Sequence, residues 1–279
     1  MRPTVQPRTA LVTGASSGLG AEFANQLARR NHDLILVARS TDRLHQMAER
    51  IRTSYGVQAD VIVQDLTAPD AAHRISAELT SRGHAIDLLV NNAGFGTAGR
   101  FEEIPPGRDH DLLMVNLVAL TDLTHALVPG MLERGDGAVI NVGSTAGFQP
   151  APYFAAYSAA KAFVLNFSLA LRAEYRGRGV RVLALMPGPI DTAFFDTTGT
   201  QAAIGARMMT PEAVVRTALR ALDHDRAYAV PGFANKLSAH LTPRRPRRLV
   251  AAISKKMTQK VLSAPTSTPA PHQRHSQPA

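Results

Sequence analysis

A tyrosine and a lysine stand four residues apart, at Tyr157 and Lys161, in a stretch whose composition predicts a helix. Residues spaced i and i+4 lie on one helix face, so both side chains can point into the same cleft. A free tyrosine titrates near ~10, and a nearby ammonium favours the phenolate, which moves the pKa toward the range useful for acid–base catalysis. Ser144, just after a predicted strand, can hold a carbonyl oxygen beside the tyrosine hydroxyl. Alone, this spacing also fits an exposed surface pair, so its meaning depends on the surrounding motifs.

A glycine-rich turn near the amino terminus is a second candidate site. Residues 13–20 read Thr-Gly-Ala-Ser-Ser-Gly-Leu-Gly, between an apolar stretch and a predicted helix. Glycines at such a turn let the backbone approach a pyrophosphate, and the helix amino terminus behind them favours the anion. This position favours a dinucleotide site over a simple tight turn. The residues expected to contact the dinucleotide here are Gly14, Ser16, Ser17, Gly18, Leu19 and Gly20.

The end of the second predicted strand bears on which nicotinamide cofactor is preferred. An NAD site generally places Asp or Glu there for the ribose 2′-hydroxyl, and a carboxylate repels a 2′-phosphate. Here the strand ends Val37-Ala38-Arg39-Ser40, with no acid and with a guanidinium suited to a phosphate. A solvated surface arginine is the alternative interpretation. The residue types favour NADP(H) as the cofactor.

The elements that must position these residues can be read from the hydrophobic pattern. Short β-branched stretches alternate with longer helical patterns, which predicts a parallel sheet wrapped by helices. Several stretches are continuously apolar, as expected where helices cover both sheet faces. Right-handed crossovers then give one doubly wound, seven-stranded α/β domain of the Rossmann type. The predicted strands are Thr9–Thr13, Asp33–Ala38, Gln58–Gln64, Asp87–Asn91, Ala138–Val142, Arg181–Met186 and Ala227–Val230.

Taken in this order, the motifs resemble those of a single-domain, NADP(H)-type member of the short-chain dehydrogenase/reductase family. The resemblance covers about residues 9–230. It rests on the 13–20 turn, Asn91-Asn92-Ala93-Gly94 after the fourth strand, Asn116, Ser144, Tyr157 with Lys161, and Pro187–Thr192 after the sixth strand.

The resemblance implies a role for each matched residue. Tyr157 would be the general acid in reduction and the base in oxidation, Lys161 would bind the nicotinamide ribose and lower the Tyr157 pKa, and Ser144 would orient the substrate carbonyl. Asn116 would break its helix locally and hold a water that links Lys161 to solvent. The further cofactor contacts that it implies are Asp65 and Leu66 at the adenine, Asn92, Ala93 and Gly94 at the adenosine ribose, and Pro187, Gly188, Ile190 and Thr192 at the nicotinamide.

The function implied is an NADP(H)-dependent oxidoreductase that transfers a hydride between nicotinamide and a carbonyl or secondary alcohol. The expected substrate is a hydrophobic or lipid-derived ketone or aldehyde, and the expected assembly is a homo-oligomer built on the helices carrying Asn116 and Tyr157. A non-catalytic dinucleotide-binding sensor or scaffold on the same fold is the alternative. The four matched catalytic residues argue against it, because a sensor needs only the first half of the chain. A sugar-nucleotide epimerase generally needs a larger carboxy-terminal domain.

Composition narrows the class further. The 279 residues are 45% hydrophobic and 19% charged, which is typical of a soluble globular protein. The absence of cysteine excludes disulfides, iron–sulfur clusters and thiol catalysis, and the scattered histidines predict no metal site. No apolar run approaches the ~18–20 residues of a membrane span, and residues 1–8 lack the apolar core of a secretory signal. We therefore expect a cytoplasmic protein.

The net charge of +9 belongs to the carboxy-terminal tail. Beyond Arg226 there are nine basic residues and no acid, which leaves 31 − 9 = 22 basic against 22 acidic residues in the body. Hydrophobic residues recur there at helical spacing, at Leu249, Val250, Ile253, Met257 and Val261. This pattern fits a helix packed on its own domain or a partner subunit, which we favour, or a helix on an anionic membrane surface. Nucleic-acid binding is not expected, because no aromatic residue follows Phe233 to stack on bases.

These observations divide the chain into four parts. They are an amino-terminal extension (1–8), the catalytic domain (9–233), a basic amphipathic extension (234–263) and a Pro/Ser/Thr/Gln-rich tail expected to be disordered (264–279). The segment after Pro187 predicts either a lid over an apolar pocket or a packed surface helix. Its apolar residues are Phe194, Phe195, Ile204, Met208 and Met209. Thr210 and Pro211 then predict a helix start, as N-cap and first helical residue.

Overall fold

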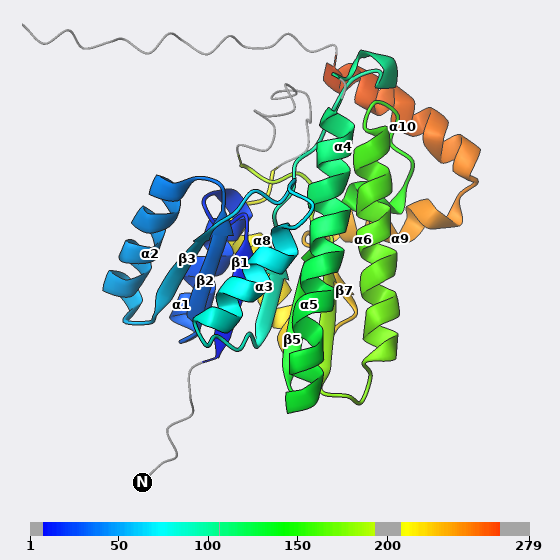
Figure 1. Cartoon of the computed structure of the whole chain (residues 1–279). Coiled ribbons are helices and arrows are strands. Elements are labelled where there is room, and N and C mark those ends of the chain that lie inside the picture. The colour runs from blue at the N-terminus through cyan, green and yellow to red at the C-terminus, as the bar shows by residue number, and fades with distance from the viewer. Residues whose placement is uncertain (1–7, 106, 193–207, 263–279) are drawn as a thin grey trace, which may run out of the picture.

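The computed structural model describes residues 8–105, 107–192 and 208–262, with side chains described as far as residue 259 (Figure 1). The proposed lid residues Phe194, Phe195 and Ile204 lie outside the described residues, as do residues 1–7 and 263–279.

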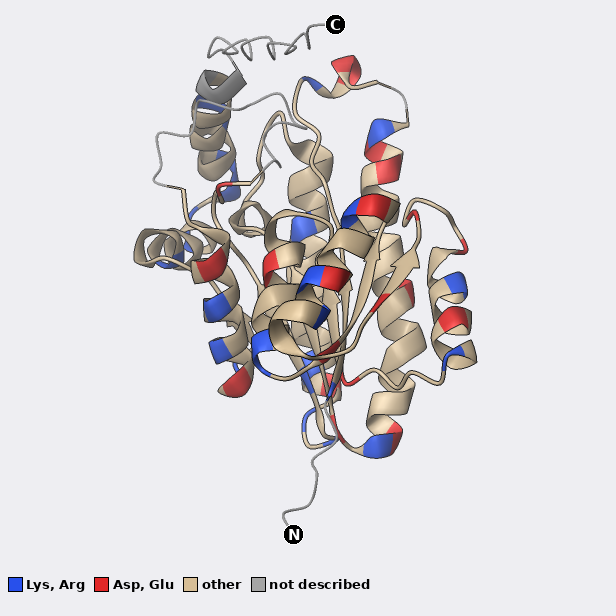
Figure 2. Ribbon diagram, turned by 90° about the vertical axis from the view of Figure 1, so that its left-hand side faces the viewer, with Lys and Arg blue, Asp and Glu red and all other residues tan. Residues whose placement is uncertain are grey.

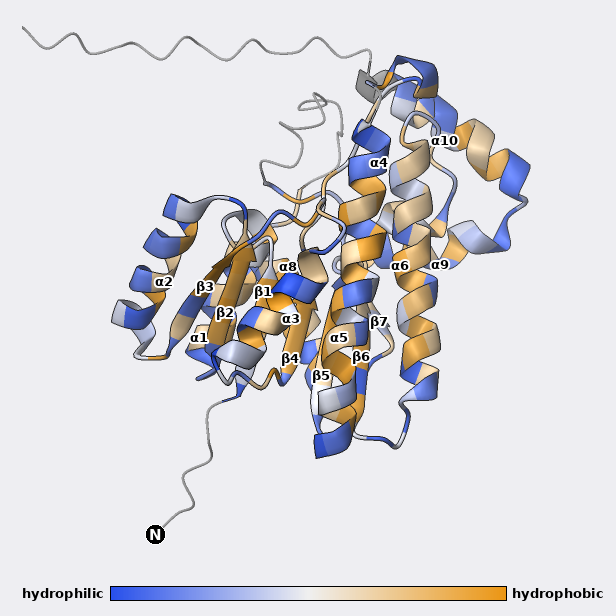
Figure 3. Cartoon of the chain, in the orientation of Figure 1, coloured by the Kyte–Doolittle hydropathy of each residue, from blue (hydrophilic) through white to orange (hydrophobic). Residues whose placement is uncertain are grey.

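A seven-stranded parallel sheet forms the centre of the fold, in the order β3-β2-β1-β4-β5-β6-β7. All seven strands predicted from the sequence are present, with ends that differ by a residue or so. Figure 3 shows these strands as mostly hydrophobic, because helices cover both faces. The strands are β1 (Thr9–Thr13), β2 (Asp33–Ala38), β3 (Ala59–Val63), β4 (Leu88–Asn91), β5 (Gly137–Val142), β6 (Val180–Leu185) and β7 (Tyr228–Ala229).

Two hydrophobic cores lie on opposite faces of the sheet. The first contains Phe23, Ile51 and Leu219, from α1 (Gly18–Arg29), α2 (Thr41–Tyr55) and α8 (Pro211–Asp223). The second contains Ile75 and Leu123, from α3 (Ala71–Ser81) and α5 (Ala119–Arg134), with α6 (Ala155–Glu174) packed beside them. This three-layer arrangement is the doubly wound α/β fold that the sequence predicts.

The strand order reverses between β1 and β4, which are adjacent although two other strands separate them in sequence. In open α/β sheets, ligands bind at the carboxyl ends of the strands at such a switch point. The glycine turn after β1 and the Asn92–Gly94 segment after β4 therefore meet at the same edge of the sheet, and Ser144 follows β5 next to them.

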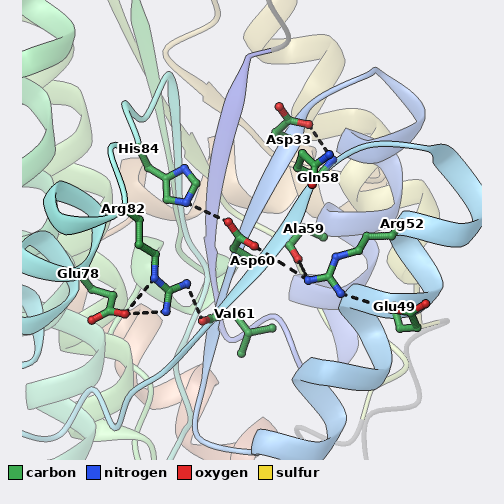
Figure 4. Close-up of polar contacts among 10 residues, drawn as sticks. All are labelled: Asp33, Glu49, Arg52, Gln58, Ala59, Asp60, Val61, Glu78, Arg82 and His84. Atoms are coloured by element: carbon green, nitrogen blue, oxygen red, sulfur yellow. Dashed lines mark hydrogen bonds and ion pairs between the residues drawn. The ribbon is translucent and has the colours of Figure 1, made fainter.

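The outer edge of β3 is covered by charged side chains rather than by another strand (Figure 4). Arg82 donates to the carbonyl oxygen of Val61 at 3.3 Å, and Arg52 donates to that of Ala59. Beside them, Asp60 Oδ2 lies 2.9 Å from His84 Nε2, and Asp60 Oδ1 forms an ion pair with Arg52 at 4.0 Å. These groups use the outward hydrogen-bonding capacity of an edge strand, which discourages pairing with a second chain.

Among the described residues, one helical segment, Arg108–Arg134, is long and apolar enough to cross a membrane by length and composition alone. No apolar stretch of this length is expected from the sequence, and this segment is the exception. It comprises α4 (Arg108–Leu113), a π-helical turn (Met114–Val118) and α5. Leu112, Leu123 and Met131 are buried in the domain, which gives its apolar character a structural reason within the fold.

Beyond β7 the chain forms α9 (Phe233–Leu241), a 3-10 turn (Thr242–Arg244) and α10 (Arg247–Leu262), which lies across one end of α6 (Figure 1). Val250 and Ser254 of α10 are buried. A cavity of about 550 Å³ separates the extension from the start of α6, and its walls include Phe148, Ala159, Arg245 and Val250. The extension thus packs on its own domain along one side only.

Candidate active site

The hydroxyl groups of Ser144 and Tyr157 form a hydrogen bond with each other. Ser144 lies directly after β5 and caps a 3-10 turn (Thr145–Phe148), where its Oγ accepts from the backbone N–H of Ala146 at 3.2 Å. Tyr157 lies in the first turn of α6. Gly147 allows this turn to approach α6 closely, since a Cβ there would be 2.5 Å from the carbonyl oxygen of Lys161.

Lys161 lies one turn after Tyr157 and is 6% exposed. Its Nζ is 5.7 Å from the centroid of the Tyr157 ring and donates to the carbonyl oxygen of Val142 at 3.0 Å. Burial lowers the pKa of Lys161 to about 8, because a desolvated ammonium is disfavoured. Lys161 of the predicted i, i+4 pair is therefore buried and Tyr157 is partly buried, so the two do not form an exposed surface pair.

The pKa of Tyr157 moves in the direction opposite to the one the sequence predicts. Burial raises it to about 12, and the hydrogen bond with Ser144 only partly opposes this effect. The net shift is upward because desolvation of the phenolate outweighs the hydrogen bond with Ser144, and the lowering of this pKa by Lys161 stays a prediction. Burial also disfavours the positive charge on Lys161, and it is this charge that would lower the pKa of Tyr157.

Asn116 lies in the π-helical turn and is 1% exposed. Its Nδ2 donates to the carbonyl oxygens of Leu112 at 2.9 Å and Phe95 at 3.1 Å. Its buried Oδ1 accepts no hydrogen bond from the described part of the chain. A Cβ at Gly94 would lie 2.6 Å from this Oδ1 and 3.5 Å from Lys161 Nζ, so Gly94, Asn116 and Lys161 meet at one point. The local helix break expected at Asn116 is present.

The glycine turn is fitted tightly against the segment after β4. Asn92 Nδ2 donates to the carbonyl oxygen of Thr13 at 2.9 Å, and the backbone N–H groups of Asn92 and Ala93 both donate to Thr13 Oγ1 at 3.0 Å. Gly14 has a φ of +66°, and a Cβ at Gly20 would lie 2.1 Å from the carbonyl oxygen of Gly14. Glycine is required at both positions, the first for its conformation and the second for close packing of α1 on the turn.

The residues of this turn fit a dinucleotide. Ser17 precedes the first turn of α1, where backbone N–H groups lack helical partners and favour an anion. Ser16, Gly18 and Leu19 are partly accessible beside it. Gly18 lies against Thr192, as a Cβ there would be 3.4 Å from Thr192 Cγ2. The structure therefore brings the expected phosphate turn and the expected nicotinamide loop together.

Arg39 is exposed at the carboxyl end of β2 and forms no ion pair with the acids of the described segments. Asp65 is also exposed, and its Oδ1 accepts from the backbone N–H and the hydroxyl of Thr67, both at 3.0 Å. Leu66 is 6% exposed and belongs to the core, so only its backbone is available for an adenine contact.

The loop after β6 lies beside Ser144, because the N–H of Thr145 donates to the carbonyl oxygen of Pro187 at 2.8 Å. Ile190 pairs with Met209 in a short parallel bridge, which fixes both ends of the segment between them. Thr210 caps α8 through a hydrogen bond from the N–H of Ala213 at 3.4 Å, and Pro211 is its first residue, as predicted.

Several positioning contacts are not expected from the sequence, which marks Asn91 only as part of the motif after β4. Asn91 Nδ2 donates to Asn141 Oδ1 at 2.9 Å, and Asn141 Nδ2 donates to Ser168 Oγ at 3.0 Å, which ties β4 and β5 to α6. Asn235 of α9 packs on Gly188, where a Cβ would lie 2.4 Å from Asn235 Nδ2. The polar residues in apolar strands are a recognisable signal for the first group, whereas nothing in the sequence marks Asn235. No cluster of metal-ligating side chains occurs within the described ranges.

The chain is similar to known proteins of one family. A profile for the family described as short chain dehydrogenase matches residues 8–203. The very-long-chain 3-oxoacyl-CoA reductase of Anas platyrhynchos is 39% identical over 186 residues, which cover 64% of this chain and 58% of the relative. The inactive hydroxysteroid dehydrogenase-like protein 1 of Homo sapiens is 33% identical over 188 residues, which cover 67% of this chain and 57% of the relative. The matched region is thus less than three fifths of these relatives' length.

Solved structures match over more of the chain. A short-chain dehydrogenase from Sphingobium yanoikuyae in complex with NADPH is 31% identical, with a TM-score of 0.77 and coverage of 95% of this chain and 99% of that chain. The similarity therefore includes most of the region beyond β7 as well as the sheet.

Proposed function

The chain belongs to the short chain dehydrogenase family, and from this premise we propose that it is an NADP(H)-dependent oxidoreductase acting on the carbonyl group of a hydrophobic, lipid-derived ketone or aldehyde. The observation that carries the proposal is the hydrogen-bonded hydroxyl pair of Ser144 and Tyr157 beside the buried amine of Lys161. The reaction class is that of alcohol dehydrogenases that use NADP. The name of the Anas platyrhynchos relative supports a lipid-derived substrate.

The proton in this reaction is assigned to Tyr157. Bound NADPH supplies the hydride to the carbonyl carbon. The Ser144 hydroxyl holds the carbonyl oxygen, and Tyr157 gives its phenolic proton to that oxygen, which completes the alcohol. Because the pKa of Tyr157 is raised to about 12, the phenol retains its proton at neutral pH. The protonated phenol is the form that carbonyl reduction needs, whereas alcohol oxidation needs the phenolate as base.

Lys161 and Asn116 return a proton to Tyr157 in this scheme. The pKa of Lys161, lowered to about 8, places the amine within the range where it can take up and release protons. Asn116 Oδ1 is a buried acceptor beside the same point and is suited to hold a water that connects Lys161 to solvent. Asn116 is held in that position by its two backbone hydrogen bonds.

The cofactor is assigned to the edge of the sheet around the glycine turn. The backbone of residues 14–20 and the start of α1 would hold the pyrophosphate. Arg39 would pair with the 2′-phosphate of NADP(H), because its guanidinium is exposed and forms no ion pair in the described structure. The NADPH complex of the Sphingobium yanoikuyae structure supports this choice. The remaining contacts proposed are Asp65, Leu66, Asn92, Ala93, Gly94, Tyr157, Lys161, Pro187, Gly188, Ile190 and Thr192.

We also propose a homo-oligomer, formed through the outer faces of the π-turn, α5 and α6. Val118 and Phe163 are exposed large hydrophobic residues on these elements. Phe163 stacks on Phe167 with 5.4 Å between the ring centroids, which presents a flat apolar surface. The proposed location is the cytoplasm. Light scattering of the purified chain tests the assembly, and a monomer at all concentrations would contradict it.

The proposed activity is tested by following a label. NADPH deuterated at the transferred C4 position is incubated with the chain and a panel of long-chain 3-oxoacyl thioesters and hydrophobic ketones. Mass spectrometry should find one deuterium on the carbinol carbon of the product. NADPH binding without transfer to any substrate would contradict the proposal and favour the sensor function.

A further inference from the structure

The exposed hydrophobic residues of this protein are concentrated in the extension formed by α9 and α10. Twelve large hydrophobic residues are exposed in the described structure, and six of them lie between residues 233 and 257. This short segment therefore holds half of the exposed apolar side chains of its kind. The six are Phe233, Leu237, Leu241, Leu249, Ile253 and Met257.

Each helix of the extension carries three of these residues at positions i, i+4 and i+8. At about 100° per residue, such positions form one stripe along a helix. On α9, Leu237 lies roughly opposite the buried Ala239 and the half-buried Asn235, which face the domain. On α10, the stripe lies beside Val250 and Ser254, the residues that pack inward. Both stripes thus remain uncovered when the extension is folded on its domain.

The same segment is strongly positive. Beyond Arg226 the sequence has nine basic residues and no acid, whereas the preceding body is balanced at 22 basic and 22 acidic residues. In Figure 2 the ribbon that leads into the grey carboxy-terminal trace carries blue segments and no red ones. None of the basic side chains described there forms an ion pair. They are Lys236, Arg244, Arg245, Arg247, Arg248, Lys255 and Lys256, all exposed.

We propose that α9 and α10 form a docking surface for an anionic lipid bilayer, hereafter the docking surface. A bilayer offers both an apolar layer for the two stripes and a negatively charged headgroup layer for the basic residues that flank them. A second copy joined through the same surface would bring two sets of unpaired positive charges together, which opposes a two-fold contact. The electrically balanced body provides no large excess of acid for a head-to-tail contact either.

The docking surface begins next to the proposed active site. Asn235, in the first turn of α9, packs against Gly188 of the loop after β6 and donates to the carbonyl oxygen of Pro231 at 3.0 Å. A chain docked through Phe233 therefore holds this loop close to the bilayer. Docking as such does not depend on the proposed reductase activity, so the failure of one leaves the other intact.

Vesicle co-sedimentation of the full chain tests the proposal. Vesicles of phosphatidylcholine with phosphatidylglycerol should bind the chain, and vesicles of phosphatidylcholine alone should bind it on the order of tenfold more weakly or worse. Raising the salt concentration should weaken binding to the anionic vesicles. Absence of sedimentation with anionic vesicles would overturn the proposal.

Variants identify the surface that binds. F233S with M257S removes the two most exposed side chains of the stripes, 83% and 65% exposed, at little structural cost. K255E with K256E reverses two charges on α10. Each pair should reduce binding roughly tenfold or more, whereas V63S and R74E, at exposed positions of the body, should leave it unchanged. Unchanged NADPH binding and thermal melting show that each variant is folded.

Two results would overturn the assignment. Equal vesicle binding by F233S/M257S and the unaltered chain would mean that charge alone is responsible and that the stripes do not insert. A concentration-dependent oligomer that is lost in F233S/M257S, without vesicle binding by the unaltered chain, would mean that a second copy covers the surface.

Discussion

Gly94 and Asn116 pack so closely that a β-carbon on Gly94 would lie 2.6 Å from Asn116 Oδ1 and 3.3 Å from its Cγ. The first residue follows β4 and the second lies in the π-turn between α4 and α5, so the contact joins the proposed cofactor site to the proposed proton path. The helix cannot continue regularly here, because Asn116 Nδ2 takes the carbonyl oxygen of Leu112. Asn116 Oδ1 and Lys161 Nζ both lie near the point where Gly94 leaves room, since a Cβ there would be 2.6 Å from the first and 3.5 Å from the second.

Replacing Gly94 by alanine should displace the Asn116 side chain. A 1 Å misplacement of a group near the chemistry can cost about a hundredfold in rate, so we expect kcat of G94A to fall by about that factor. Steady-state kinetics measures this effect. G130A is the matched control, since a Cβ there meets only the flexible end of Arg134 and the substitution suits a helix. An unchanged kcat in G94A would contradict the role given to Asn116.

Removing the Arg39 guanidinium should weaken NADPH binding selectively. A charge-assisted hydrogen bond contributes about 1.5–3 kcal/mol, so the Kd of R39A for NADPH should rise roughly ten- to hundredfold while its Kd for NADH stays the same. Titration calorimetry is suitable, because the chain contains no tryptophan whose emission could report binding. R226A removes an exposed arginine before β7, at the opposite edge of the sheet, and should bind NADPH normally. Equal weakening for NADPH and NADH in R39A would show that Arg39 does not read the 2′-phosphate.

The buried Lys161 and the partly buried Tyr157 should make the free energy of unfolding change with pH in opposite directions, in two separate pH ranges. The pKa of Lys161 is lowered to about 8 from 10.5, so between these values the unfolded chain binds more protons and stability should rise with pH. The gain is about 3 kcal/mol at most. The pKa of Tyr157 is raised from 10.0 to about 12, so above pH 10 the unfolded chain loses its proton first and stability should fall.

Denaturant unfolding across this pH range checks both slopes. Relative to the unaltered chain, K161M should lose the rise above pH 8, and Y157F should lose the fall above pH 10. Parallel pH profiles for all three proteins would mean that neither group is titrating in the buried environment that the structure gives it.

The same high pKa of Tyr157 predicts unequal pH profiles for the two reaction directions. Reduction needs the phenol, which is present throughout the neutral range, and oxidation of the alcohol needs the phenolate. The kcat for oxidation should therefore continue to rise with pH above neutrality, while the kcat for reduction should not. A plateau in oxidation below pH 8 would show that Tyr157 titrates far lower in the working enzyme.

Sequence patterns were sufficient for the sheet because its strands are apolar on both faces and its helices are amphipathic. The grouping of Ser144, Tyr157 and Lys161 followed from their order relative to those strands. The pKa direction of Tyr157 did not follow, because it depends on how deeply the phenol is buried, which spacing alone cannot give. Asn235 was missed for a similar reason: its contact with Gly188 joins segments whose packing is decided by the path of α9.

The exposed stripes of the extension show the same limit. The sequence predicts an amphipathic helix over Leu249–Val261 but not which side of it faces the domain. Because Val250 and Ser254 turn inward, Leu249, Ile253 and Met257 are left exposed. In that orientation one face of α10 packs on the domain, while the neighbouring face is free to bind the proposed bilayer.

The central claim is that Tyr157 transfers the proton in an NADPH-dependent carbonyl reduction, and Y157F tests it most directly. Calorimetry should show NADPH binding to Y157F with an unchanged Kd, while oxidation of NADPH by a substrate that the unaltered chain reduces should fall by about 10²–10⁴-fold. Full turnover in Y157F would contradict the account, because the proton would then come from another group.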